Sequence, residues 1–281
     1  MIRVTFCGVR GSTPSPGADF LRYGGNTSCL ALSDGDGPPR LLLDAGTGLM
    51  AVTPLLAGRP FDGTVLLSHL HWDHTHGLPF FAGGGMPGAR LHLRLPEQGV
   101  PAEDLLARAF SPPHFPVLPH QLGAGWSFDT IDEGEHSFEG FTVRALEIPH
   151  KGGRMFGYRV SRGEASLAYL TDHSPISLGP GPDGLGERHA AALELAHDVD
   201  VLIHDAQHRA SQFPEVAYLG HASPEYAVAL AREAGARSLM LFHHAPTRTD
   251  DEIDEILAEL ATDGLPVRAA CEGLVLDLPE A

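Results

Sequence analysis

Four histidines and one aspartate crowd into eight consecutive positions behind an apolar run of the chain. The centre of this segment reads H-x-H-x-D-H and comprises His69, His71, Asp73 and His74. One-residue spacing in an extended segment points two imidazoles to the same side, and a turn then brings the carboxylate and the next histidine round. A lone histidine is more often a satisfied core or surface residue. Four ligand-type residues at fixed short spacing instead predict a metal site, with Zn as the default ion and Mn or Fe as alternatives.

A site for two cations needs more ligands than this one segment supplies. Two cations a few ångströms apart repel each other, and carboxylates between them offset that repulsion. The ends of three later apolar runs offer further ligands, namely His150, Asp172 and either His243 or His244. Strand ends are where α/β proteins gather their chemistry. Of the two adjacent histidines, His243 is favoured because it directly follows its run.

Apolar and β-branched runs that read as strands occur through the whole chain, at 2–8, 28–33, 40–46, 64–68, 89–95, 141–148, 155–161, 165–171, 199–205, 238–242 and 273–278. Helical patterns fall at 47–57, 187–197, 223–235 and 249–261, and the last two begin with Ser and Thr as N-caps. Two segments, 9–27 and 96–135, read as long loops. This order predicts a layered α/β fold with sheets inside and helices outside, and residues 1–281 as a single domain.

The ligand pattern resembles the metallo-β-lactamase superfamily. The segment 41–48, LLLDAGTG, also resembles the early strand of that superfamily and its buried aspartate, here Asp44. The resemblance covers nearly the whole chain and implies a four-layer αβ/βα sandwich with two divalent metal ions. It implies that His69, His71 and His150 hold one ion, that Asp73, His74 and His243 hold the other, and that Asp172 bridges them. Asp44 would orient a ligand by hydrogen bonding.

Three further segments resemble the ribonuclease Z and small-phosphodiesterase branch of the superfamily. They are HKGGRMFGYRV at 150–160, LIHDAQ at 202–207 and GHASPEYAVALA at 220–231. The resemblance implies that His221 donates a proton to the leaving oxygen and that Asp205 is its carboxylate partner. The bland alternative is that His221 caps its helix region and that Asp205 ends a strand.

Composition and charge limit the classes of substrate and the cellular compartment that we expect for this protein. The chain has a formal net charge of -17 and no lysine- or arginine-rich run, so a long nucleic acid is disfavoured. Three widely spaced cysteines fit a reducing cytoplasm better than a disulfide framework. The N-terminus lacks a signal-peptide pattern and no apolar run approaches a membrane span, so a cytoplasmic protein without a membrane partner is expected. The family resemblance adds a homodimer as the common assembly.

These observations predict a metal-dependent hydrolase, foremost a phosphodiesterase that acts on a small or cyclic phosphodiester. A hydroxide activated between two metals and oriented by Asp73 would attack phosphorus. Lys151 and Arg154 would supply a local cationic spot, or they are solvated loop charges. The segment 111–117, SPPHFPV, would form either a lid or a structural cover.

Three alternatives stay open. The same fold could hydrolyse an ester, lactone or β-lactam. It could cleave tRNA, although residues 77–149 contain only four arginines and no lysine, without the long basic arm of tRNA-processing members. A non-catalytic small-molecule binder is the least favoured, because the ligand set is complete.

Overall fold

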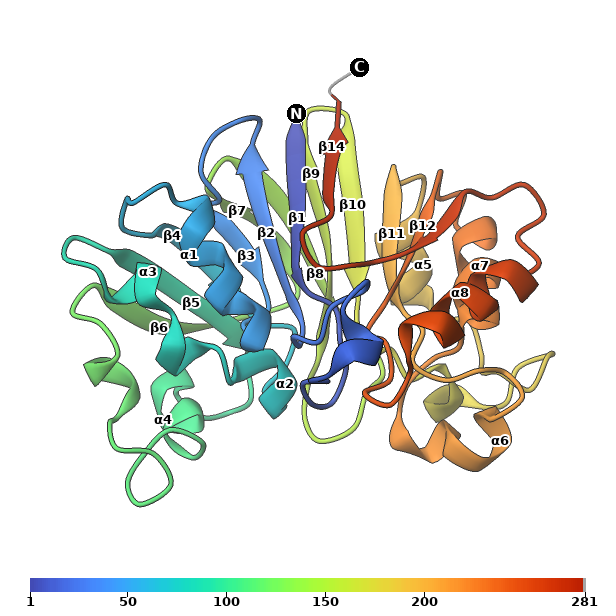
Figure 1. Ribbon diagram of the computed structural model, residues 1–281, viewed down its shortest axis with the longest axis horizontal. Helices are drawn as coiled ribbons and strands as arrows, with labels where there is room; N and C mark the ends of the chain where they lie inside the picture. Colours follow the sequence, from blue (N-terminus) through green and yellow to red (C-terminus); the bar gives the residue numbers. More distant parts are fainter. Residues whose placement is uncertain (280–281) are drawn as a thin grey trace.

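Two mixed β-sheets pack face to face in the computed structural model, which describes residues 1–279 (Figure 1). The first sheet runs in the order β14 (Val275–Leu278), β1 (Ile2–Gly8), β2 (Cys29–Asp34), β3 (Leu41–Leu43), β4 (Asp62–Leu66), β5 (Arg90–Pro96) and β6 (Trp126–Ile131). The second sheet runs in the order β13 (Val267–Ala269), β12 (Leu239–Phe242), β11 (Val201–Asp205), β10 (Ala165–Leu170), β9 (Phe156–Arg162), β8 (Phe141–Glu147) and β7 (Gly134–Phe138).

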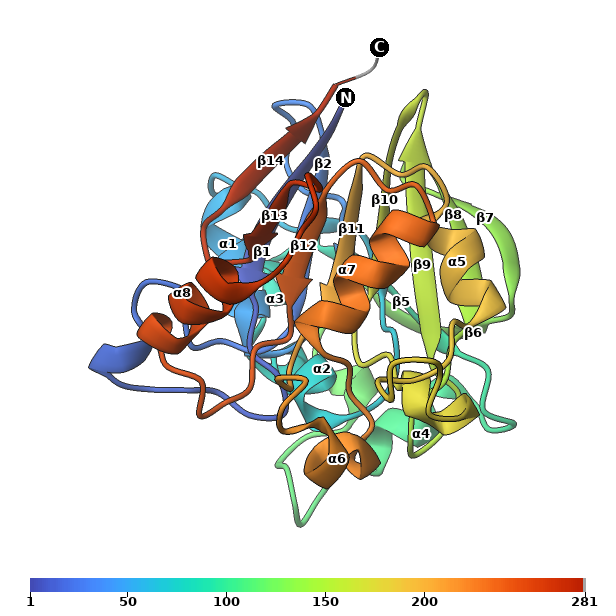
Figure 2. The same ribbon diagram turned by 90° about the vertical axis from the view of Figure 1, so that its right-hand side faces the viewer.

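Most helices cover the outer faces of the two sheets, and some lie at the lower edge in Figure 1 (Figures 1 and 2). Those of the first half are α1 (Val52–Leu55), α2 (Trp72–Thr75), α3 (Ala82–Gly85) and α4 (Ala102–Ala107). Those of the second half are α5 (Ala190–Ala196), α6 (Phe213–Val216), α7 (Pro224–Glu233) and α8 (Asp250–Glu259). Short 3₁₀ turns lie at Ala18–Phe20, Thr47–Ala51, Leu78–Phe80, Pro119–Gln121, Pro175–Leu178 and Ala217–Leu219. The predicted αβ/βα sandwich is confirmed.

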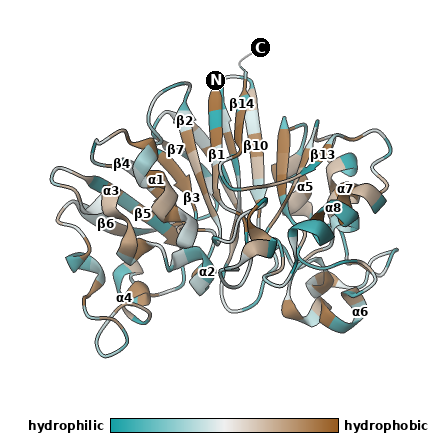
Figure 3. Cartoon of the chain, viewed as in Figure 1, coloured by the Kyte–Doolittle hydropathy of each residue, from teal (hydrophilic) through white to brown (hydrophobic). Residues whose placement is uncertain are grey.

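Three apolar clusters hold the layers together. The central cluster joins the inner faces of the two sheets and includes Phe6 and Leu30 from one and Tyr158 and Phe242 from the other. The other two clusters lie between each sheet and its own helices. Brown strands beneath mixed teal and brown helices in Figure 3 show the same layering. Burying both faces of a sheet requires near-continuous apolar strands, which is why these runs were legible in the sequence.

Parallel pairing gathers several strand ends at one edge of the molecule. β10, β11 and β12 run parallel, with Leu170 opposite His204 and Asp205 opposite Phe242. β3 and β4 also run parallel in the first sheet. The residues that follow these strands therefore meet at a common edge of the two packed sheets.

The segment 96–135 differs from the prediction of a long loop. It contains α4, a 3₁₀ turn and β6, which pairs in parallel with β5 from Leu91↔Trp126 to Pro96↔Ile131. β6 has four partly buried residues and one exposed residue, so its sequence lacks the apolar run that marks a buried strand. The helix predicted at 47–57 is also shorter, a 3₁₀ turn that leads into α1.

The two best-defined helices match their sequence signals. Ser223 Oγ accepts a hydrogen bond from Tyr226 N–H at 3.2 Å at the start of α7. Thr249 and Glu252 form the predicted capping box at the start of α8. Within residues 1–279, no helix is long and apolar enough to cross a membrane.

Candidate metal centre

All seven predicted ligands lie just beyond strand ends at the shared edge of the sheets. The H-x-H-x-D-H segment leaves β4 and turns into α2, whereas His150, Asp172 and His243 follow β8, β10 and β12. Asp172 and His243 have positive φ angles, of 50° and 59°. Left-handed backbone at residues other than glycine costs energy, and it occurs mainly at sites where the surroundings enforce it. The tight turns point these side chains back over the ends of their strands.

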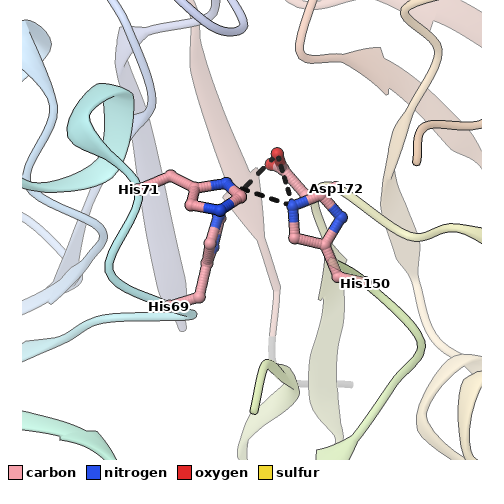
Figure 4. Close-up of side chains that lie close together, drawn as sticks. All are labelled: His69, His71, His150 and Asp172. Carbon is pink, nitrogen blue, oxygen red and sulfur yellow. Dashed lines mark hydrogen bonds and ion pairs between the residues drawn. The ribbon is translucent and has the colours of Figure 1, made fainter. Parts of the chain in front are cut away.

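One group of side chains consists of His69, His71, His150 and Asp172 (Figure 4). His150 Nε2 and His71 Nδ1 are 3.2 Å apart. Asp172 Oδ1 lies 3.7 Å from His150 Nε2 and 3.9 Å from His69 Nε2. Three ring nitrogens and one carboxylate oxygen thus converge on a common point.

A second group shares Asp172 and adds Asp73, His74 and His243. Asp172 Oδ2 is 3.0 Å from both His74 Nε2 and His243 Nε2. Asp73 Oδ2 is 3.1 Å from His243 Nε2. Asp172 therefore faces both groups with different oxygens, which is the position predicted for a bridging ligand.

The structure separates the two adjacent histidines after β12. His243 points into the second group, whereas His244 Nε2 donates to the carbonyl of Ala270 at 2.9 Å. Burial lowers the pKa of His244 to about 3, so its ring is neutral at physiological pH. The geometry therefore places His243, and not His244, among the candidate ligands.

Asp44 orients the candidate ligand His74 by a hydrogen bond, as the family resemblance implied. Its carboxylate is fully buried and accepts hydrogen bonds from His74 Nδ1 at 2.8 Å, Tyr169 Oη at 2.8 Å and Ser68 N–H at 2.7 Å. Ser68 Oγ also bonds Asp44 and lies 3.0 Å from His69 Nδ1. Ser68 and Tyr169 were not predicted, because a serine and a strand tyrosine carry no ligand signature in a sequence.

These contacts test whether the side chains suit bound cations. With Nδ1–H of His74 donated to Asp44, the Nε2 lone pair faces the carboxylates of Asp73 and Asp172 at 3.2 and 3.0 Å. The buried Nε2 atoms of His69 and His74 have no hydrogen-bond partner among the described residues. Lone pairs that face carboxylates repel unless positive charge lies between them, so the donor set fits divalent cations.

The electrostatics of the side chains alone agree with this reading. Burial disfavours charge on His243, but Asp172 and its neighbouring carboxylates raise the pKa of His243 to about 10. Burial, together with the neighbouring His221 and His71, lowers the pKa of His150 to about 4. The carboxylates thus attract positive charge most strongly in the second group, where the protein can hold it as protons or as a metal ion.

Asp205 and His221 form a dyad beside the second group. Asp205 Oδ2 accepts from His221 Nδ1 at 2.8 Å, and Asp205 Oδ1 accepts the backbone N–H groups of Gln207 and Ala222, each at 3.0 Å. Although burial opposes it, the adjacent His221 holds the pKa of Asp205 well below its usual range. His221 Nδ1 is also 3.7 Å from Asp172 Oδ1. The predicted pairing of His221 with Asp205 is present, and Asp205 is also the last residue of β11, as the alternative stated.

Two backbone features of nearby loops were not predicted as parts of the site. Ser12, with a φ of 62°, donates its N–H to Asp73 Oδ2 at 2.7 Å. Gly152 has a φ of 90°, and a Cβ there would approach His71 Nε2 to 2.8 Å. The sequence predicted a long loop at 9–27, but no sequence signal identified the particular N–H group.

Two cavities open at the centre. One, of about 350 Å³, is lined by Ser12, Leu70, His71, Trp72, Asp73, Asp172 and His221. The other, of about 370 Å³, adjoins it and is lined by His69, Leu70, Trp72, Gln98, Val100, Leu105, Arg108, Ala109, Lys151, Gly152, Gly153 and Arg154. Lys151 and Arg154 thus both face a cavity beside the candidate ligands.

The segment 111–117 contacts the rest of the protein through the ring of Phe115. The ring of Phe115 lies 6.1 Å from the rings of both Phe80 and Phe110, and His114 is exposed. Neither His114 nor Phe115 is among the residues that line the two cavities. The segment therefore packs against Phe80 and Phe110 and lines neither of the two cavities.

Comparisons with known proteins agree with this architecture. Residues 39–244 match the family described as "Beta-lactamase superfamily domain". Ribonuclease Z of Archaeoglobus fulgidus is 25% identical over 92% of this chain and 92% of the relative. The metallo-beta-lactamase fold protein YhfI from Bacillus subtilis superposes with a TM-score of 0.71 at 18% identity, covering 99% of this chain and 100% of that one. A diphosphatase from the PhnP family superposes with a TM-score of 0.70 at 18% identity, covering 99% and 98%.

The family match spans the H-x-H-x-D-H segment and reaches the strand end at His243. The matched relatives include the ribonuclease Z branch that the sequence resembles. The chain therefore belongs to the family described as "Beta-lactamase superfamily domain". Its fold is the metallo-β-lactamase fold.

Proposed function

We propose that this protein is a metal-dependent phosphodiesterase that hydrolyses a small or cyclic phosphodiester. The observation that carries the proposal is the Asp205–His221 dyad, which lies against Asp172 and faces the same cavity as the candidate ligands. Cleavage of a phosphodiester needs a proton for the departing oxygen, and a histidine is suited to supply it near neutral pH. The names of the matched ribonuclease Z and of the PhnP-family diphosphatase also denote cleavage of phosphate linkages.

Two divalent cations would be held by the seven side chains that converge at the sheet edge, His69, His71 and His150 on one side, Asp73, His74 and His243 on the other, and Asp172 between them. When bound, such cations activate water and offset negative charge on a phosphoryl group. Zn is the default for this donor set, with Mn and Fe as alternatives.

The protein groups around the cations have separate tasks. Asp44 fixes the ring orientation of His74 through Nδ1, which leaves Nε2 free to bind. Asp73, held by the N–H of Ser12, faces the cavity where the attacking water would lie. Asp205 fixes His221 through Nδ1, so that Nε2 is the atom that would deliver the proton to the leaving oxygen.

The charge distribution supports a small substrate over tRNA. The net charge of the chain is -17. Among the four arginines of residues 77–149, Arg90, Arg94 and Arg144 pair with Asp62, Asp129 and Glu194. Because their charge is offset within the protein, these arginines leave little for a long phosphate backbone.

The test is the His221→Ala variant, assayed with bis-p-nitrophenyl phosphate. We expect unchanged metal content and a fall in kcat of roughly two orders of magnitude or more, because a general acid typically contributes 10²–10⁴-fold. Asp205→Asn should show the same pattern to a smaller degree. Parallel assays with a lactone and a nitrocefin-type β-lactam separate ester chemistry from phosphodiester chemistry. Equal turnover by His221→Ala and the unmodified enzyme would contradict the role of His221. Turnover of the lactone alone would contradict the phosphodiesterase proposal.

A further inference from the structure

Lys151 is the only lysine in the chain and directly follows the candidate ligand His150. Its side chain is exposed, and its Nζ lies 5.4 Å from the ring centroid of Tyr218. No carboxylate among residues 1–279 pairs with it, whereas nearby Arg154 pairs with Glu147 at 2.8 Å. Of the two cations that the sequence suggested here, Lys151 is therefore the one with charge to offer a ligand.

Arg108 brings a second such cation to the same cavity from the end of α4. It is exposed and has no carboxylate partner in the described part of the chain. In a protein with a net charge of -17, acidic partners are abundant, and the other three arginines of residues 77–149 each have one. Arg108 and Lys151 therefore both line one cavity of about 370 Å³ without a carboxylate partner among the described residues.

The loop that carries Lys151 is hydrogen-bonded to Gln98, which also lines this cavity, and contacts His71 of the other cavity. Gln98 accepts from the backbone N–H of Arg154 at 3.0 Å and donates to its carbonyl at 2.7 Å. Gly152 has a φ of 90°, and a Cβ there would lie 2.8 Å from His71 Nε2, so a larger residue would be strained and would have to displace the ring. These contacts fix the backbone of the loop at residues 152 and 154, so the flexible side chain of Lys151 extends from an ordered backbone.

The cationic cavity adjoins the reacting position and has one candidate ligand, His69, in its lining. Candidate ligands His71, Asp73 and Asp172, together with His221, line the other cavity. The two cavities share only Leu70 and Trp72 in their linings. A substrate whose scissile phosphodiester faces His221 must pass Trp72 to reach Arg108 and Lys151.

We propose that Arg108 and Lys151 form a subsite for a second, non-reacting phosphate group of the substrate. The inference rests on the proposed function and adds that the preferred substrate carries two phosphates, one a diester and one terminal. An ammonium and a guanidinium suit a phosphate dianion, since both donate charge-assisted hydrogen bonds. A substrate without the terminal phosphate would gain nothing from either side chain.

A matched pair of chromogenic substrates tests the subsite. Thymidine 5′-(p-nitrophenyl phosphate) and its 3′-phosphorylated form carry the same scissile bond and differ by one terminal phosphate. We expect the 3′-phosphorylated form to have a KM roughly tenfold lower or better, and the Arg108→Gln/Lys151→Gln variant to lose that advantage. The variant should raise the KM for the 3′-phosphorylated form by a larger factor than the KM for the form without the 3′-phosphate. Arg59→Gln is the control, because it removes one exposed positive charge outside the cavity.

The outcomes separate the two proposals. If neither substrate is hydrolysed, the phosphodiesterase proposal fails while the subsite can still be judged by binding. If both substrates lose turnover equally in the double variant, the two cations serve the scissile phosphate and the subsite proposal is overturned. Equal KM values for both substrates with the unmodified enzyme would overturn it as well.

The single lysine allows a second measurement that needs no turnover. Thymidine 3′,5′-bisphosphate should protect Lys151 from acetylation by sulfosuccinimidyl acetate, as read by peptide mass spectrometry, and thymidine 5′-phosphate should protect it several-fold less. Lys151→Arg, which contains no lysine, shows how much label goes to the N-terminus. Equal acetylation of Lys151 with both nucleotides present or absent would contradict the subsite.

Discussion

The metal-ligand cluster and the cationic cavity beside it are built in opposite ways. The cluster draws its side chains from the ends of strands in both sheets, and hydrogen bonds fix several of them from behind, as Asp44 fixes His74. The cationic cavity draws Arg108 and Lys151 from connecting segments, and both side chains are exposed. Most side chains of the first region are buried and hydrogen-bonded, whereas the side chains of Arg108 and Lys151 are exposed.

This difference assigns different parts of the activity to the two regions. Groups that position a reacting centre must stay within fractions of an ångström, and buried strand ends achieve that. Groups that select a substrate need only present charge or an aromatic face, and loops can vary them at little cost to the fold. We therefore expect changes in the cluster to abolish the chemistry and changes in the cavity to alter preference.

The largest effect should follow from Asp172→Asn. Asp172 belongs to every group of side chains that could hold a metal, so loss of its charge should lower the metal content to below one ion per chain, measured by mass spectrometry of the elements. Turnover should fall by roughly three orders of magnitude, because the cations supply several kcal/mol of charge stabilisation. Asparagine tolerates the positive φ of 50° at this position, so the backbone should remain in place.

Two variants make that result specific. Asp198→Asn alters an exposed aspartate with a similar φ of 51°, and it should change neither metal content nor turnover. His150→Ala removes a member of the first group only, so it should retain one ion per chain. Retention of two ions by Asp172→Asn would show that this carboxylate does not bridge them.

A moderate effect should appear in the pH dependence of stability after metal removal. The pKa of His243 is raised from 6.5 to about 10 by the surrounding carboxylates, so its proton stabilises the metal-free fold. That contribution is complete below pH 6.5 and is lost as the pH rises toward 10. The metal-free protein should therefore melt at a lower temperature at pH 8.5 than at pH 6.5.

The metal-loaded protein should show the opposite trend, because ligand histidines bind cations only without that proton. In the metal-free His243→Ala variant, the dependence between pH 6.5 and 8.5 should flatten, although the neighbouring His74 also has a raised pKa. A metal-free protein whose melting temperature rises across this range would contradict the assignment of the stabilising proton.

The comparison also explains what the sequence could and could not reveal. Asp172 and His243 were predictable because each follows an apolar strand, and parallel pairing of β10, β11 and β12 brings such ends together. His150 also follows an apolar strand, β8, which runs antiparallel to β9 as β10 does, so its end falls at the same edge. The neighbourhood of Arg108 was hidden, because it depends on how the segment 96–135 folds back along β5. That segment has few apolar runs, so its helix and strand come from tertiary packing and not from local pattern. Tyr169 and Ser68 were missed for the same reason, since only the folded sheets bring them to Asp44.

Trp72 lies on the boundary between the two regions and should give the smallest effect. It is 67% exposed, and one face of its indole stacks on His76 at 5.4 Å between ring centroids. The rest of the ring faces both cavities. Because the side chain buries little, Trp72→Ala should change the free energy of unfolding by no more than about 0.5 kcal/mol.

Binding of a nucleoside substrate should nevertheless weaken in this variant. Stacking of a base on an aromatic side chain contributes about 1–3 kcal/mol, so at the low end the KM of thymidine 5′-(p-nitrophenyl phosphate) should rise by roughly fivefold with unchanged kcat. The KM of an ester without a planar ring beyond the leaving group should not move. Thymidine 3′,5′-bisphosphate should also quench the fluorescence of the unmodified protein through Trp72, but not that of Trp72→Phe, which retains only Trp126. Quenching that persists in Trp72→Phe would show that the base does not stack on Trp72. Trp72 would then separate the two cavities without contacting the substrate.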